Sequence, residues 1–409
     1  MQNTQRIFNR IKQVSYNQVL AVLFVVSMFY IASATLPSTI MNIGSFLKDE
    51  KRDILSTRQK IDDEYRNMLE FHGNYFINKG AYINLNGLMA RVIGQRWMNE
   101  RVKLNNGHLT YLWRKQNTSR AAIQMTKLNN AQIENGGNFL FVLAPHQIPG
   151  DEDILPVGYK DYGNQNADEL LDKLRKNNVP YLDLRKELRK DDISYADAFF
   201  VTDHHWKPET GFWAYTKTID YLISESIIQP IDSMYTDKSF FNVEVYKNWI
   251  LGSNGKRTGS YYAGVDDFSI ITPKFETEIT LEKPIRKTTI KGSFAEVAYN
   301  YEKNVKDYFS ANPYAAYGNG ERDTKYYRNV SAPVDLKVLG LKDSFGLASF
   351  TFLPLVFSVY DELDMRNYNG DFLDYYTNFE PDIVLIIVNS SSQLLDDNTT
   401  YDYFNDLTK

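Results

Sequence analysis

From residue 118 onward, short apolar segments alternate with longer segments of mixed polarity, and this alternation limits the possible folds most strongly. A predicted helix at 119–134 ends before Gly136 and Gly137, and an apolar run, FLFVLA, follows at 139–144. A second helix is expected at 166–176, a strand at 179–184, and a third helix from Pro208, where proline favours the first turn. Such alternation predicts a parallel sheet with helices on both faces.

The pattern changes between residues 232 and 330. Alternating segments such as FNVEVY (241–246) and FSIITPKFETEITLE (268–282) are typical of antiparallel strands, and Gly- and Asn-rich connections separate them. The strand–helix pattern then returns, with a strand at 334–341, a helix at 346–358, a strand at 360–365 and a buried terminal strand at 381–388. We therefore expect one α/β domain from 118–231 and 331–409, interrupted by a β-rich insertion at 232–330.

The N-terminal sequence indicates the cellular compartment in which the protein works. An uncharged apolar run of 18 residues, 19–36, follows a basic segment. At ~1.5 Å per residue such a helix spans ~27 Å, close to the thickness of a bilayer core. The charge asymmetry predicts a cytoplasmic segment at 1–16, a single transmembrane helix at 17–37 and an extracellular remainder. Ala32-Ser33-Ala34 also fits a signal-peptide cleavage site, which would give a secreted protein. Residues 38–117 should form a charged stalk helix and a mixed segment before the domain.

Composition excludes several functional classes. The chain has no cysteine, which rules out a thiol nucleophile, a disulfide framework and a cysteine zinc site. Its net charge is -5 with both signs interspersed, so no basic surface for nucleic acid is expected. The 29 Tyr, 24 Phe and 5 Trp suit stacking on sugar rings, although core packing is the commoner use of aromatic residues.

Two segments carry candidate chemistry. Asp203 and His205 lie two residues apart, a spacing that lets the carboxylate accept from the imidazole and leaves the other ring nitrogen free as a base. Ser344 lies between a predicted strand and a predicted helix, where open α/β sheets place their sites. Because serine needs a base, the three residues together indicate a Ser-His-Asp hydrolase or acyltransferase.

Simpler interpretations remain open for each residue. A serine before a helix is most often an N-cap, and an Asp-His pair is often only a buried hydrogen-bond network. Asp203, His204, His205 and His146 could also be considered as metal ligands. Adjacent histidines point to opposite sides of an extended chain and no further ligand cluster is evident, so we expect no metal and no cofactor.

The motifs TDHHWKPETG (202–211) and LKDSFG (341–346) resemble the DHHW protein family, which is related to the SGNH-like acetyltransferases of alginate and other exopolysaccharide systems. Three further segments are similar to this family: FVLAPHQIPGDEDILP (141–156), GSNGKRTGSYYAGVDD (252–267) and DELDMR (361–366). The resemblance covers most of the chain from about residue 70. It implies an SGNH-hydrolase-like, flavodoxin-like fold with Ser344 as nucleophile, His205 as base and Asp203 as the orienting acid.

The resemblance also implies transfer of acetyl groups to a polysaccharide outside the membrane, beside a membrane-bound O-acyltransferase that supplies the acyl group. The usual SGNH oxyanion blocks are not recognisable in this sequence. Further pocket residues are therefore only guesses: the backbone N–H of Phe345, Gly318 with Asn319, and the side chains of Tyr317, Arg366 and His204.

Two rival functions stay open. The same triad could act as a carbohydrate esterase with water as the acceptor. Alternatively, the chain could be a membrane-tethered polysaccharide-binding or scaffold protein with a vestigial triad. A Ser344 beyond hydrogen-bond reach of His205 would favour that second rival.

Overall fold

The computed structural model describes residues 21–26, 28–29, 78–150, 154–320, 324–364, 366–368 and 370–389. The chain divides into two units, Met1–Tyr82 and Ile83–Lys409. Residues 21–26 are helical, but within the described ranges no helix is both long and apolar enough to cross a bilayer. The predicted anchor at 17–37 and stalk helix lie largely outside the described residues, so both stay predictions.

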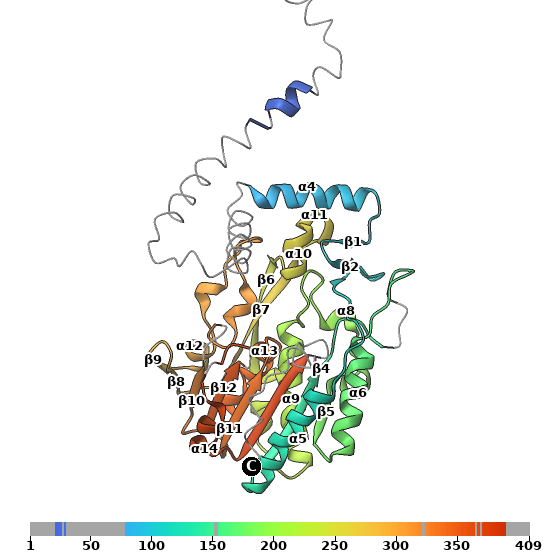
Figure 1. Ribbon diagram of the computed structural model, residues 1–409. Coiled ribbons are helices and arrows are strands. Elements are labelled where there is room, and N and C mark those ends of the chain that lie inside the picture. Colours follow the sequence, from blue (N-terminus) through green and yellow to red (C-terminus); the bar gives the residue numbers. More distant parts are fainter. Residues whose placement is uncertain are drawn as a thin grey trace, which may run out of the picture. The chain divides into compact units, whose positions relative to one another are not determined.

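An eight-stranded sheet forms the centre of the second unit, in the order β5-β4-β13-β11-β12-β10-β8-β9 (Figure 1). The first five strands of this order run parallel, and the last three join antiparallel at the edge of β12. The bounds, in sheet order, are β5 Tyr181–Asp183, β4 Asn138–Ala144, β13 Ile383–Asn389, β11 Val334–Lys342, β12 Phe357–Asp364, β10 Lys325–Arg328, β8 Ile279–Lys283 and β9 Thr288–Gly292.

Both faces of the parallel strands are buried, as the apolar runs predict. Along β4, Phe139, Phe141 and Leu143 enter one core, whereas Leu140 and Val142 enter the other. This division follows from the two-residue period of a strand. Helices α5, α6 and α14 cover the first core, and α7, α9 and α13 cover the second. The sheet is therefore enclosed in an α/β sandwich.

Except for the helix expected at 346–358, the helices begin and end close to the expected residues. The predicted helix at 119–134 is α5, and the proline at 208 starts α9 as expected. The α-helices are α4 Lys79–Val92, α5 Ser119–Glu134, α6 Gly163–Lys176, α7 Leu184–Lys190, α8 Tyr195–Ala198, α9 Pro208–Ser224, α10 Ser253–Thr258, α11 Ser260–Ala263, α12 Phe294–Ala298, α13 Gly346–Phe350 and α14 Phe372–Phe379.

The remaining strands form two smaller sheets. Strands β6 (Phe241–Ile250) and β7 (Asp266–Pro273) form an antiparallel pair, and the segment between them carries α10 and α11. Strands β1 (Trp97–Met98), β2 (Arg101–Lys103) and β3 (Leu109–Thr110) form a short antiparallel sheet. Both lie in segments outside the predicted α/β pattern, and both supply residues to the site described below.

The structure corrects three expectations. The main sheet is mixed, because β8, β9 and β10 of the predicted insertion continue it beyond β12. The predicted strands at 268–282 divide accordingly between the β6–β7 pair and the main sheet. The predicted helix at 346–358 ends at Phe350, since Pro354 sits in a short 3-10 turn, Leu353–Leu355, before β12. The predicted terminal strand, β13, lies inside the sheet between β4 and β11.

Candidate active site

Ser344 lies at the carboxyl end of a central strand. β11 ends at Lys342, and α13 starts at Gly346. The turn is tight, because a Cβ on Gly346 would lie 2.6 Å from Cβ of Lys342. The Asp343 carboxylate fixes the turn by accepting hydrogen bonds from the backbone N–H groups of Phe345 (2.8 Å) and Asn389 (3.0 Å). Ser344 is thus held where β11 and β13 both end, as expected for a doubly covered sheet.

Asp203 and His205 come from the loop between α8 and α9. Trp206, which is fully buried, pairs with Phe199 in an isolated β-bridge that closes this loop. The side chain of Gln147 donates to the backbone carbonyls of Phe200 (2.9 Å) and Asp203 (2.7 Å). The loop is therefore fixed at its base and at its tip.

The three predicted residues form a continuous hydrogen-bonded chain. His205 Nε2 lies 2.7 Å from Ser344 Oγ, and His205 Nδ1 lies 2.6 Å from Asp203 Oδ1. Asp203 Oδ1 also accepts from the backbone N–H of His205 at 3.0 Å. A carboxylate on Nδ1 stabilises the tautomer whose Nε2 can accept a proton from serine. His205 and Ser344 are 139 positions apart in the sequence, and the fold brings them together.

The charges and hydrogen-bond donors around Asp203 keep its carboxylate ionised. Burial alone would raise its pKa, but His204, His205 and the backbone N–H of Ser253 together hold the pKa of Asp203 well below its usual range. The Ser253 N–H donates to Asp203 Oδ2 at 2.5 Å. Each oxygen of the carboxylate therefore has a donor, which fixes its orientation.

The segment between β6 and β7 supports this carboxylate. Gly252 donates its N–H to Thr202 Oγ1 at 2.8 Å, and Thr202 Oγ1 in turn donates to Asp266 Oδ2 at 2.6 Å. A Cβ on Gly252 would lie 2.3 Å from Cβ of Asp203, which only glycine avoids. The part of the chain predicted as an insertion thus contacts the triad acid directly.

His204 lies beside the triad and faces the pocket. Its ring centroid is 3.8 Å from that of His205, and its Nδ1 lies 3.0 Å from Ser253 Oγ. Burial, with the neighbouring His205, lowers the pKa of His204 to about 3, so its ring is neutral near pH 7. Ligating atoms of Asp203, His204 and His205 lie within 4.8 Å of one another, a grouping that could hold a metal ion. In the geometry seen, however, both ring nitrogens of His205 are already engaged by Asp203 and Ser344.

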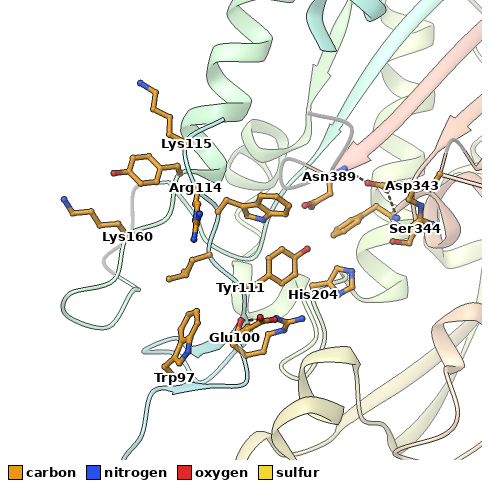
Figure 2. A pocket seen from close by; sticks show the side chains of 16 residues that line it. Trp97, Glu100, Tyr111, Arg114, Lys115, Lys160, His204, Asp343, Ser344 and Asn389 are labelled. Atoms are coloured by element: carbon orange, nitrogen blue, oxygen red, sulfur yellow. Dashed lines mark hydrogen bonds between the residues drawn. The ribbon is translucent and has the colours of Figure 1, made fainter. Parts of the chain in front are cut away.

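Ser344 opens into a pocket of about 930 Å³. Figure 2 shows Ser344, Asp343 and Asn389 at one end of this pocket and Lys115 and Lys160 at the other. The lining residues are Trp97, Glu100, Arg101, Tyr111, Leu112, Trp113, Arg114, Lys115, Lys160, Tyr162, His204, Asp343, Ser344, Phe345, Arg366 and Asn389. A volume of this size lies in the range of small-molecule and cofactor pockets.

Three of the tentative pocket residues do line the pocket. His204 is one, and Phe345 contributes its ring, whose centroid lies 5.2 Å from that of His205. The Phe345 N–H, however, already donates to Asp343, so it is not the free oxyanion donor that we expected. Arg366 also lines the pocket, but it forms a two-point ion pair with Asp364 at 2.9 and 2.6 Å.

The other three tentative residues lie elsewhere. Tyr317 is fully buried and donates to the Ser269 carbonyl at 3.0 Å. Asn319 accepts hydrogen bonds from the buried ammonium group of Lys283, through its side chain and its carbonyl. Neither residue, nor Gly318 between them, lines the pocket. The suggestion that this turn contributes to the pocket is therefore not supported, since its polar groups bond to Lys283 and Ser269.

Sequence reasoning missed most of the pocket wall. Tyr111, Trp113 and Arg101 belong to the segment around β1–β3, which carries no strand–helix pattern and was assigned to the region before the domain. Asn389 could have been found, because it ends a predicted apolar strand next to that of Ser344. Ser253 gave no signal of its own, since it contacts the triad only through the fold.

Comparisons with known proteins agree with this architecture. Residues 105–229 match the family described as "SGNH hydrolase-like domain, acetyltransferase AlgX", a range that includes Asp203 and His205 but not Ser344. PatB1 of Bacillus cereus, in a structure with a sulfonyl adduct, is similar with a TM-score of 0.60 and 20% identity, over 76% of this chain and 100% of that one.

A DHHW family protein from Eubacterium siraeum is similar with a TM-score of 0.57 and 17% identity, over 76% of this chain and 98% of that one. At such identities the two structures establish the fold alone. Among curated proteins, no sequence matches this chain. The resemblance of the motifs to DHHW-type and SGNH-like proteins is thus confirmed, and residues 105–229 match the SGNH hydrolase-like AlgX acetyltransferase family.

Proposed function

We propose that this protein is an extracytoplasmic O-acetyltransferase that moves acetyl groups onto a polysaccharide through a covalent acyl-Ser344 intermediate. The observation that carries the proposal is the hydrogen-bonded chain from Asp203 through His205 to Ser344, opening into a pocket of about 930 Å³. The family match supports acetyl transfer as the chemistry. The distance of 2.7 Å between Ser344 Oγ and His205 Nε2 does not meet the condition that would favour a vestigial triad.

The first half-reaction forms the acyl-enzyme. His205 Nε2 takes the hydroxyl proton of Ser344 as Oγ bonds to the acyl carbon of the donor. The negative charge that develops on the acyl oxygen needs N–H donors, each worth about 3 kcal/mol. The Ser344 N–H makes no hydrogen bond to a described residue and is the nearest candidate. The imidazolium then gives its proton to the leaving group, and Asp203 stabilises the cation in between.

The second half-reaction regenerates the enzyme. A sugar hydroxyl gives its proton to His205 while its oxygen bonds to the acyl carbon. The bond from the carbon to Ser344 Oγ breaks, and the serine recovers its proton from the imidazolium. Atoms and charge balance without a metal, a nucleotide or a redox partner.

The cellular setting of the proposal rests on the sequence. The apolar run at 19–36 and the basic residues before it support a membrane-anchored chain with its α/β domain outside. In that setting the acyl donor must come from the membrane side, and a membrane-bound O-acyltransferase partner would supply it.

Product analysis tests the proposal. Wild-type protein is incubated with 4-nitrophenyl acetate and an oligosaccharide acceptor, and the products are compared with those of Ser344→Ala. We expect acetylated oligosaccharide from the wild type and background amounts from the variant. Full transfer by Ser344→Ala would contradict the mechanism. Acetate release at a rate that ignores the acceptor would identify an esterase with the same triad.

A further inference from the structure

The pocket has a charge balance opposite to that of the whole chain. The protein carries a net charge of -5, yet the pocket is lined by more basic than acidic residues. The basic residues are Arg101, Arg114, Lys115, Lys160 and Arg366, and the acidic residues are Glu100 and Asp343. The Asp343 carboxylate is buried, accepts two backbone N–H groups and interacts electrostatically with Arg366, which also pairs with Asp364, so the excess positive charge lies on the other four basic residues.

Among the basic residues of the pocket, Arg101 has the surroundings that differ most from those of a surface arginine. It is partly buried, and its Nε donates to Asn254 Oδ1 at 2.6 Å while Nη1 donates to the backbone carbonyl of Glu100 at 3.0 Å. Within the described residues no carboxylate lies within ion-pair distance of its guanidinium. Burial, and then repulsion from Arg257, lowers the pKa of Arg101. A partly desolvated cation with neutral partners is a strong donor for an incoming anion.

Three further cations line the far end of the pocket. Arg114, Lys115 and Lys160 are exposed, and none of them forms an ion pair with another described residue. Figure 2 places them away from Ser344, with Tyr111 between the two ends. The acidic residues 151–153 lie outside the described ranges. These cations therefore lie at the end of the pocket away from Ser344.

Aromatic rings occupy the space between the cations. Trp97 stacks on Tyr159 with ring centroids 6.0 Å apart, and Tyr111 packs edge-on against Trp113 at 5.5 Å. The Trp113 indole N–H is buried and has no hydrogen-bond partner among the described residues. Exposed ring faces beside cations suit a ligand that is both a sugar and an anion.

We propose that the outer half of this pocket binds anionic sugar residues of the acceptor, bearing carboxylate or phosphate groups, while a neighbouring hydroxyl reaches Ser344. This inference rests on the proposed function for the role of the sugar, but it concerns binding and can be tested without turnover. Placing the charges at one end and the serine at the other lets remote contacts position the reacting hydroxyl.

The test measures binding to the full-length chain carrying Ser344→Ala, in a non-ionic detergent. The probes are tetragalacturonate, its neutral methyl ester and a phosphorylated maltotetraose. The site variant adds Arg114→Gln, Lys115→Gln and Lys160→Gln. The matched control adds Lys186→Gln, Arg189→Gln and Lys190→Gln, three exposed basic residues on α7. Both triple variants change the net charge by the same amount, so a difference between them is local.

We expect at least one of the charged probes to bind about tenfold more tightly than the methyl ester at low salt. The site variant should raise the Kd of that probe about tenfold, the control variant should not, and added salt should reduce the difference. The phosphate and carboxylate probes distinguish the two kinds of anion. Equal binding of charged and neutral probes, or no effect of the site variant, would overturn the inference.

A failure of the proposed function can be distinguished from a failure of this binding inference. A wild-type protein that forms no acyl-enzyme would contradict the role of Ser344. The binding comparison would still hold or fail by itself, since every protein in it lacks the Ser344 hydroxyl.

Discussion

At the scale of single residues, the site depends on which groups carry charge. The triad acid is ionised because two histidines and a backbone N–H outweigh the effect of burial on the pKa of Asp203. His204 is the opposite case, since burial and its neighbour His205 keep its ring neutral. A neutral His204 can hydrogen-bond with Ser253 without adding positive charge next to the base. The neutral His204 ring therefore adds no positive charge beside the ionised Asp203 carboxylate.

The neutral state of His204 predicts how stability depends on pH. Its pKa is about 3 in the folded protein, against about 6.5 when unfolded. Between these values the unfolded state binds the extra proton, so the free energy of unfolding should fall as the pH drops from about 6.5 toward 3. His204→Gln should reduce that slope by up to about 1.4 kcal/mol per pH unit. Urea unfolding of the wild type and of His204→Gln at pH 4, 5, 6 and 7 measures how the free energy of unfolding depends on pH. The same slope in both proteins would contradict the low pKa of His204.

At the scale of elements, the strand–helix pattern predicted the central parallel strands well and the rest less well. The strands at 139–144 and 334–341 were found because they are short and largely apolar; the first is buried throughout, and the second is buried from Val338 onward. Ser344 was placed at a strand end for the same reason, and the structure brings its Oγ within 2.7 Å of His205 Nε2. The antiparallel strands β8 and β10 were assigned to an insertion, because alternation shows that a strand has two different faces but not which sheet it joins. Pocket residues such as Tyr111 depend on contacts between distant segments, which no local pattern shows.

The segment between β6 and β7 should matter for catalysis although it lies outside the parallel sheet. Gly252→Ala would place a methyl group against Asp203 and shift the Ser253 N–H that orients its carboxylate. We expect a loss of about 10–100-fold in kcat for ester hydrolysis, because small displacements of a triad member are costly.

The control for this prediction is Gly150→Ala, where a Cβ would make only an ordinary contact at 3.5 Å from Asn164. Hydrolysis rates and Tm values of the two variants are compared with the wild type. A Gly252→Ala enzyme as active as the Gly150→Ala enzyme would show that this segment does not position the acid.

At the scale of the whole molecule, a buried charge cluster joins the parallel and antiparallel halves of the sheet. Lys342 on β11 and Lys325 on β10 are both fully buried, and both approach Glu362 Oε1 on β12, at 3.6 and 2.8 Å. Asp364 Oδ2 lies 3.8 Å from Lys342 Nζ. Lys342 lies two residues before Ser344, so the cluster connects the added strands to the strand that leads into Ser344.

Removing the shared carboxylate should destabilise the fold. In Glu362→Gln, two buried ammonium groups lose their common counter-charge, and we expect the free energy of unfolding to fall by about 3 kcal/mol or more. Glu282→Gln on neighbouring β8 is the matched control, because Glu282 is exposed. Guanidinium unfolding curves report both variants. Equal stability of the two would mean that the cluster does not hold the halves together.

The central claim is that Ser344 becomes acylated. The most direct measurement is the intact mass of the protein after brief exposure to 4-nitrophenyl acetate, for the wild type and for Ser344→Ala, with circular dichroism to show that both are folded. We expect a single added acetyl group on the wild type, located on Ser344 by peptide mapping, and none on the variant. A folded wild type with no adduct and no acetate release above background, or an equal adduct on both proteins, would contradict it.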